Sequence, residues 1–241
     1  SAMEEFWSLF PILMVVAIEV VLSRWIKERK QHKAEQRSNQ KTMNPAVGRV
    51  LRQNDPALDT TPDGPVPFGY QTSWAAVKCG SPDEVINALQ LSGKRANWAA
   101  GLAAAEQGRG LFVSPCLDGY VLIVGRETWR VYPGCFDEVQ QFDTQRVSDC
   151  ARWALYRNGR KLREFSYEDG DVTIDDGPLT TEEQTLGFDA FPRKYERRES
   201  TEQNELRFPD EEDVLNIAAA WGIDPRFEKK TYPPSVGWLC T

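Results

Sequence analysis

An α+β fold is expected for this chain, with an antiparallel sheet packed against about four helices and an apolar helix ahead of them. Two alternating runs, RWALYR and KLREFSY, flank Asn158-Gly159, the pair preferred in tight hairpin turns. Other segments begin with a capping residue and continue with an apolar face, as helices do. Short strands, turns and such helices in one domain are typical of the α+β class.

The first expected element is the apolar segment of residues 6–26, with Trp7 and Trp25 near its ends. An α-helix would hold the two indoles roughly 27 Å apart, close to the thickness of a bilayer's hydrocarbon core. Tryptophan is favoured at both membrane interfaces, and the apolar neighbours offset the roughly 2.5 to 3.5 kcal/mol that Glu19 costs near the centre. We therefore expect residues 1–43 to form a membrane anchor and a basic extension. The alternative is a helix buried in protein.

Charge on the two sides of this segment predicts its orientation. Glu4 and Glu5 precede it, whereas seven lysines and arginines lie from Arg24 to Lys41. Positive charge is enriched on the cytoplasmic side of membrane proteins. The domain that follows is therefore expected in the cytoplasm, behind a single membrane span.

A linker is expected at residues 44–68, which hold five prolines and no helical periodicity. This composition is typical of a tether or of an extended wrap over a domain surface. Residues 69–241 then form an acidic α+β domain. The chain's five cysteines are odd in number and lack paired spacing, so reduced thiols are expected rather than a disulfide frame or a zinc site.

The domain is expected to begin with a strand at residues 69–79, which are rich in Tyr, Thr, Trp and Val. Ser81 and Glu84 are then expected to form a capping box at a helix that starts at Pro82, since proline is favoured at the first helical position. The alanine-rich residues 97–106 predict a second helix, which ends before Gly108.

Strands are expected next at residues 111–114 and 120–125. The second is the most apolar segment of the domain, so we place it inside the sheet. Residues 138–143 fit either a strand or the end of a helix. The hairpin of residues 152–167 follows, and residues 172–174 extend it into a meander.

The last third of the domain carries two more helix signals. Thr180 and Glu183 form a capping box at a short helix. Residues 193–205 are highly charged and predict a mobile loop. Residues 210–221 predict a helix whose first-turn acids suit the helix dipole. The tail around Trp238 is expected to dock on the core.

Charge divides the chain into a basic and an acidic part. Residues 1–52 hold nine basic and five acidic residues, so 20 of the 29 basic and 31 of the 36 acidic residues follow them. The resulting balance of −11 should repel nucleic acid and attract a basic protein surface. The alternative is an acidic surface that only keeps a cytosolic domain soluble.

No catalytic constellation is evident in the sequence of the domain. The single histidine, His32, lies in the basic extension, so histidine-dependent nucleophiles and metal sites lack their usual base or ligand. Phosphate-loop motifs are also missing from the sequence. We expect no enzyme activity, no cofactor and no metal.

The run EDGDVTIDDG brings Asp169, Asp171, Asp175 and Asp176 close together along the chain. Clustered carboxylates suit calcium, but the spacing departs from the EF-hand pattern, since Ile174 stands where glycine is needed. Asp-Gly pairs also occur in hairpin turns for backbone reasons alone. A carboxylate-dependent hydrolase or metal-binding enzyme built on this run is the alternative to a binding function.

Exposed aromatic residues beside charges are frequent anchors of protein interfaces. The polar loop RETWRVYPG supplies two such residues. The expected partner-binding residues are Trp129, Tyr132, Asp169, Asp171, Asp175 and Asp176.

The segments DGYVLIVG, FPDEEDVLNIAAAWGIDP and SVGWLC, in an acidic domain without catalytic residues, resemble bacterial immunity proteins encoded beside secreted toxins. The resemblance extends over residues 68–241 and assigns no residue a role. It implies a non-enzymatic domain that binds and blocks a toxin. The expected anchor and the acidic charge add that the domain is held at the bacterial inner membrane and that the toxin has a basic surface. A structural subunit of a membrane complex, in which Glu19 pairs with a partner helix, is the second alternative.

Overall fold

A computed structural model describes residues 58–126, 128, 131–146, 148–193 and 207–241. The expected membrane anchor with Trp7, Glu19 and Trp25, the expected interface residue Trp129, and nearly all of the expected mobile loop lie outside these ranges. Within the described ranges, no helix has the length and apolar character needed to cross a membrane. Residues 58–241 form one of two units of the chain, and the description below concerns this unit.

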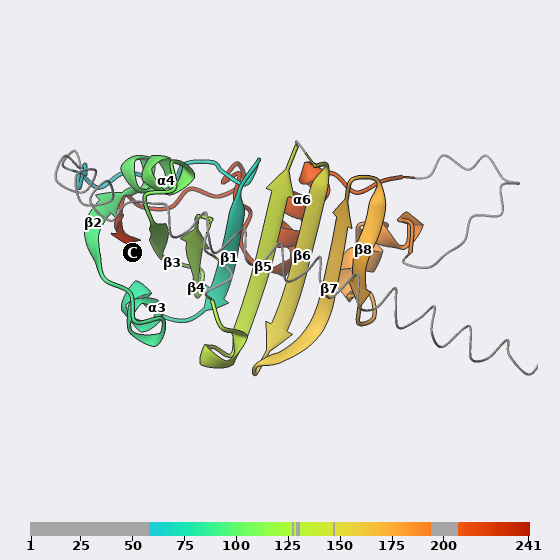
Figure 1. The fold of residues 1–241 in the computed structure, drawn as a ribbon. Coiled ribbons are helices and arrows are strands. Elements are labelled where there is room, and N and C mark those ends of the chain that lie inside the picture. The colour runs from blue at the N-terminus through green and yellow to red at the C-terminus, as the bar shows by residue number, and fades with distance from the viewer. Residues whose placement is uncertain (1–57, 127, 129–130, 147, 194–206) are drawn as a thin grey trace, which may run out of the picture. The chain divides into compact units, whose positions relative to one another are not determined.

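The described unit is built on a nine-stranded antiparallel sheet (Figure 1). The strands are β1 (Ser73–Lys78), β2 (Gly93–Asn97), β3 (Leu111–Leu117), β4 (Tyr120–Val124), β5 (Glu138–Gln145), β6 (Cys150–Arg157), β7 (Arg160–Glu168), β8 (Asp171–Asp176) and β9 (Val236–Cys240). Their order across the sheet is β2-β9-β3-β4-β1-β5-β6-β7-β8. The apolar strand expected inside the sheet is β4, between β3 and β1.

Helices accompany the sheet in the described ranges. They are α3 (Pro82–Ala88), α4 (Trp98–Glu106), α5 (Thr181–Thr185) and α6 (Glu211–Trp221), with short 3-10 turns η2 (Pro133–Cys135) and η3 (Phe188–Ala190). The α+β class and the antiparallel sheet are therefore confirmed. The capping box predicted at Thr180 and Glu183 is present at α5, whereas Ser81 at α3 accepts a hydrogen bond from Asp83 N instead of forming the box expected with Glu84. Asn97 and Asp210 cap α4 and α6, a role that was not predicted for them.

The hairpin expected at Asn158-Gly159 is present between β6 and β7. The two turn residues have φ angles of 49° and 73°, as a type I′ turn requires. The strand expected at residues 172–174 is β8, which continues the meander from β5 through β7. Residues 138–143, which fitted a strand or a helix end, belong to strand β5.

One face of the sheet carries a continuous row of large buried side chains. In register from β3 to β7 these are Phe112, Val124, Trp74, Phe142, Trp153 and Phe165. Trp74 stacks on Phe142 with ring centroids 5.0 Å apart, and Trp153 stacks on Phe165 at 4.6 Å. Apolar residues of α4 and α6 cover this row, so the main core lies between this face and these helices.

The opposite face is apolar at one half of the sheet and polar at the other. Under α3, Val85 packs with residues of β1, β3 and β4 in a second apolar cluster. From β6 to β8 the same face carries a ladder of ion pairs. Glu164 accepts from Arg152 at 2.7 Å and from Lys161 at 2.8 Å, and Lys161 also lies 2.8 Å from Asp176. The β6–β8 part of the sheet therefore has one buried face and one face that carries ion pairs.

Strands β2 and β9 were not predicted. The tail was expected only to dock on the core, but β9 lies between β2 and β3, where Cys240 pairs with Gly93 on one side and with Leu111 on the other. The first three residues of β2 are exposed, so no apolar alternation marks this strand. Both strands form because they pair with distant parts of the chain.

Residues 58–68, the second half of the expected linker, pack against the domain. The Asp63 carboxylate accepts hydrogen bonds from Trp98 N at 2.7 Å and Ala99 N at 3.0 Å, which caps α4. Phe68 is buried, and its N–H donates to Pro225 O at 3.1 Å. These residues wrap over the domain surface, and the described unit accordingly begins at residue 58.

Helix α4 comes closest to the sheet at Gly101, where an added Cβ would lie 2.1 Å from a ring atom of Phe112. We expect Gly101→Ala to lower the free energy of unfolding by about 1 to 3 kcal/mol, because this clash outweighs the roughly 1 kcal/mol by which alanine favours a helix. Ala103→Ser, on the exposed side of α4, is the matched control. Urea unfolding of both variants tests the packing, and equal stability would contradict it.

Candidate functional site

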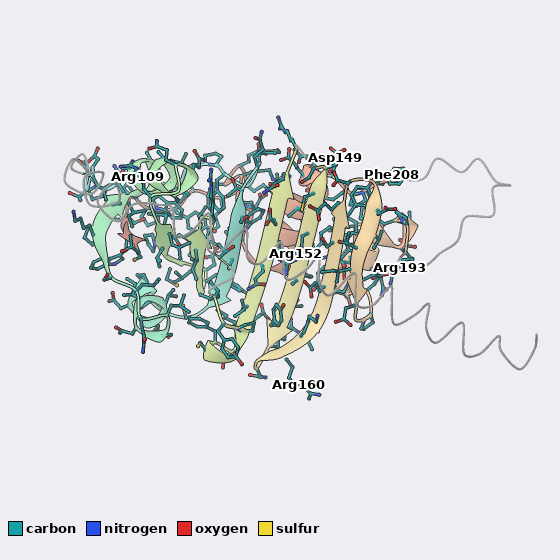
Figure 2. All side chains as sticks on the ribbon, in the orientation of Figure 1. Arg109, Asp149, Arg152, Arg160, Arg193 and Phe208 are labelled. Atoms are coloured by element: carbon teal, nitrogen blue, oxygen red, sulfur yellow. The ribbon has the colours of Figure 1, made fainter. Side chains whose placement is uncertain are left out.

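An open cleft of about 420 Å³ lies at one end of the strands. The turn between β5 and β6, the end of β7, the chain just before β1 and the start of α6 form its walls. Figure 2 labels two of its residues, Asp149 and Phe208, at this end of the sheet. Its charged lining residues are Arg146, Asp149, Asp210, Glu211 and Glu212, and its aromatic ones are Tyr70, Tyr167 and Phe208.

The start of α6 supplies most of the acids. Asp210 and Asp213 form a capping box, in which Asp213 N donates to Asp210 Oδ1 at 3.0 Å and Asp210 N donates to Asp213 Oδ2 at 3.1 Å. The helix therefore begins at Glu211, and Glu211 and Glu212 fall in its first turn. The positive end of the helix dipole stabilises carboxylates there.

Two of these acids hold the rim of the cleft together. Glu211 Oε2 accepts a hydrogen bond from Arg146 Nε at 2.6 Å. Glu212 accepts one from the Tyr70 hydroxyl. That hydrogen bond raises the pKa of Tyr70, so the phenol stays protonated and acts as a donor.

The cleft has an excess of negative charge. Of its five charged side chains only Arg146 is basic, which gives a formal charge of −3. The carboxylate of Asp149 makes no hydrogen bond or ion pair with any residue that the structure describes. The cleft therefore presents carboxylates that internal bases do not fully neutralise.

Exposed aromatic rings accompany this charge. Tyr70 is 40% exposed and Phe208 is 41% exposed. The Phe208 ring lies 5.8 Å from that of Tyr167, and the Arg146 guanidinium lies 5.8 Å from the Tyr70 ring. Large aromatic rings left in solvent beside charged groups are frequent contact points for another protein.

The cleft offers little for covalent chemistry. Burial, together with nearby carboxylates such as Asp143, raises the pKa of Cys150, the one lining cysteine, to about 11. The thiol is therefore protonated at neutral pH and a poor nucleophile. In the part of the chain that the structure describes, no three His, Cys, Asp or Glu side chains lie close enough to hold a metal ion.

The four predicted aspartates are divided between different surfaces of β8. Asp175 pairs in register with Phe165 and so lies on the helix-covered face, whereas Asp171 and Asp176 lie on the polar face. Asp169 occupies the β7–β8 turn with a φ of 50°. The structure does not bring these four carboxylates together.

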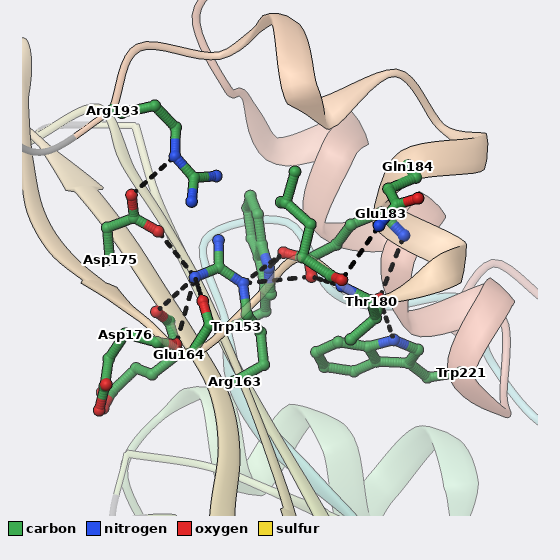
Figure 3. A network of polar contacts seen from close by, with 12 residues as sticks. Trp153, Arg163, Glu164, Asp175, Asp176, Thr180, Glu183, Gln184, Arg193 and Trp221 are labelled. Carbon is green, nitrogen blue, oxygen red and sulfur yellow. Dashed lines mark hydrogen bonds and ion pairs between the residues drawn. The ribbon is translucent and has the colours of Figure 1, made fainter. Parts of the chain in front are cut away.

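Asp175 belongs to a buried ion-pair network (Figure 3). Arg163, only 1% exposed, donates to Asp175 Oδ1 at 2.7 Å and to Glu183 Oε1 at 2.9 Å. Arg193 Nε lies 2.9 Å from the second Asp175 oxygen, and Trp153 Nε1 donates to Glu183 at 2.7 Å. The Asp175 side chain is 8% exposed. Through Arg163 it connects β8 to β7 and to Glu183 on α5.

Tyr132 is 70% exposed, as an interface anchor would be. Its loop meets the Asn158-Gly159 turn, since an added Cβ at Gly159 would lie 3.3 Å from Gly134 Cα. This turn is at the end of β6 and β7 opposite to the cleft. Asp169, by contrast, donates its N–H to the β5–β6 turn at 2.9 Å. Of the predicted partner-binding residues that the structure describes, Asp169 is the one beside the cleft.

Sequence reasoning did not single out the residues that form the cleft. The acids of the run FPDEED were noted, but only for their effect on the helix dipole. The signal available was the Phe208-Pro209 step directly before them, which places an aromatic ring beside a helix start. Tyr70 carried no such signal, because its contact with Glu212 joins residues far apart in sequence.

Fold and cleft together define an α+β domain with an open cleft lined by acidic and aromatic side chains. Comparisons with models of protein families, with curated proteins and with solved structures find no match to this chain.

Asp213, buried beneath the cleft, gives the stability of the domain a distinctive pH dependence. Burial raises the pKa of its carboxyl to about 6, despite the neighbouring Arg207. The folded state thus binds this proton more tightly than the unfolded chain, and the group's contribution to stability falls as the pH rises from about 4 to about 6. Asp213→Asn removes this loss.

We therefore expect the stability of Asp213→Asn, measured relative to the parent chain, to increase between about pH 4 and pH 7 by on the order of 1 to 3 kcal/mol. Urea unfolding at several pH values gives this difference. Asp210→Asn is the control, because asparagine also caps helices well and Asp210 is exposed. A difference for Asp213→Asn that stays flat with pH would show that the carboxyl titrates normally.

Proposed function

We propose that this chain is a non-enzymatic protein-binding protein, and specifically an immunity protein that binds and occludes a bacterial toxin. The observation that carries the proposal is the cleft, where four acidic side chains lie beside two exposed aromatic rings. Aromatic anchors among charges are suited to a protein interface, and the negative charge selects a basic partner.

The mechanism would be steric occlusion. The acidic surface covers the basic substrate-binding or cofactor-binding surface of the toxin, so the toxin cannot reach its target. Charge steers the encounter, since the chain after residue 52 carries a balance of −11. The expected anchor within residues 1–43 would hold the domain at the cytoplasmic side of the inner membrane.

Of the enzymatic alternatives, the carboxylate-dependent hydrolase and the metal-binding enzyme both depended on Asp169 to Asp176. Asp175 is engaged by Arg163 and Arg193, and its neighbours in the run lie on other surfaces. The alternative of a membrane-complex subunit depends on Glu19, outside the described ranges. The binding function is therefore the one with a supporting site.

The test is protection by the full chain. Each toxin gene that lies next to the gene of this protein is expressed in a susceptible bacterium, with and without this protein. The toxin and this protein are also purified together. The expected result is restored growth and a stable complex whose affinity falls with added salt. A toxin from an unrelated locus is the control. Failure to protect against or bind any neighbouring toxin would overturn the proposal, and so would turnover of a substrate by the purified chain.

A further inference from the structure

We infer that the cleft receives an arginine side chain of the bound partner, in the position that Arg146 now occupies. The inference rests on the proposed protein-binding function and names the chemical group that this surface recognises.

Arg146 shows how the cleft holds a guanidinium group. Its Nε donates to Glu211 Oε2 at 2.6 Å, and its guanidinium carbon lies 5.8 Å from the centre of the Tyr70 ring. A carboxylate at the edge and an aromatic ring nearby are the two contacts that favour a planar guanidinium over an ammonium ion. Tyr70 is itself held by Glu212, so the ring is in place before a ligand arrives.

The Arg146 side chain can leave this position with little loss of stability to the fold. Its side chain is 63% exposed and belongs to the turn after β5. Exposed ion pairs of this kind contribute little to the stability of a fold. Glu211 would keep its hydrogen bond from Gln71 N, 2.9 Å away. A partner's arginine can therefore replace Arg146 without disrupting buried contacts.

The cleft has space and charge for the incoming group. Its volume is about 420 Å³, and its formal charge is −3 with Arg146 in place. Asp149 has no partner for its carboxylate among the described residues, and Phe208 adds a second exposed ring. An anionic ligand is disfavoured there, because the start of α6 is already capped by the Asp210 carboxylate.

The experiment uses the full chain and a fluorescein-labelled tetra-arginine amide, with the isosteric, uncharged tetra-citrulline peptide as its control. Fluorescence anisotropy measures the dissociation constants. We expect the citrulline peptide to bind at least about tenfold more weakly, because it lacks the charge that the carboxylates recognise. Arg146→Gln should tighten binding of the arginine peptide by about threefold to fivefold, since it removes the internal competitor.

A charge-matched pair of variants locates the site. Asp149→Asn with Glu212→Gln should weaken binding of the arginine peptide by about fivefold or more. Asp83→Asn with Glu106→Gln removes the same charge from exposed positions on α3 and α4. This control should change the affinity for the arginine peptide by less than about twofold.

Equal binding of the two peptides, or an Arg146→Gln variant that binds no more tightly than the parent chain, would overturn the inference. A toxin complex that forms and is unaffected by the Asp149 and Glu212 changes would overturn it too, while the immunity role stands. Selective binding of the arginine peptide at the cleft without any toxin complex would support the inference and refute the immunity role.

Discussion

A chain that ends at Ser235, and so lacks β9, is expected to lose its cooperative unfolding transition. Because β9 lies between β2 and β3, its removal leaves both neighbours unpaired on that side. It also removes the buried side chains of Leu239 and Cys240. A buried aliphatic side chain contributes about 1.5 to 3 kcal/mol, and each backbone group left unpaired in the interior costs about 1 to 3 kcal/mol. The sum approaches the total stability of a typical domain, about 5 to 15 kcal/mol.

Circular dichroism during heating and resistance to trypsin measure the effect of this truncation. A chain that lacks only Thr241 is the first control and should unfold cooperatively. Gly237→Ala is the second, because an added Cβ would lie 2.5 Å from Val113 O and should weaken the strand without removing it. This variant should lose about 1 to 3 kcal/mol and keep its transition. A truncated chain that melts like the parent would show that β9 is dispensable.

Glu183→Gln is expected to lower the free energy of unfolding by about 3 to 5 kcal/mol. The carboxylate of Glu183 is fully buried and accepts hydrogen bonds from Trp153 Nε1, Arg163 Nε and Thr180 N at 2.7 to 2.9 Å. Glutamine keeps the shape of the side chain but turns an NH₂ group toward at least one of these donors. It also leaves the buried Arg163 with Asp175 as its remaining anionic partner.

Urea unfolding of Glu183→Gln and of Glu182→Gln, which makes the same change one residue earlier on α5, measures this effect. The Glu182 variant should change stability by less than about 0.5 kcal/mol. Arg163→Met combined with Glu183→Gln should cost less than the sum of the single changes, because the double variant no longer buries a guanidinium without its partner. Equal stability of the two glutamine variants, or strict additivity in the double variant, would contradict the coupling.

This network changes the meaning of one predicted interface residue. Asp175 was expected to contact a partner because it belongs to an acidic run. In the structure, side chains alternate across β8, so Asp175 points to the covered face while Asp176 points to the polar one. Exposure on a strand changes with every residue, and an acidic run therefore does not make a single acidic surface.

Elements marked by neighbouring residues were predicted well. The Asn158-Gly159 turn depends on the φ angles of two adjacent residues, and the capping box of α5 joins positions three residues apart. These interactions are complete within a few residues, so a local pattern is enough to detect them.

The remaining features depend on contacts between distant segments. Strand β2 has few apolar residues and forms because β9 pairs with it. Strand β9 was expected only as a docked tail and forms because β2 and β3 pair with it on its two sides. The cleft is similar, since Tyr70 meets Glu212 and Arg146 meets Glu211 only after the sheet and α6 have packed.

Amino-acid order alone specifies the α+β class, the β6–β7 hairpin and the starts of the helices, because these follow from interactions between near neighbours. Tertiary packing specifies the strand order, the buried position of Asp175 and the acidic cleft. Each of these depends on contacts between residues that are far apart along the chain, and a local sequence pattern does not predict such contacts.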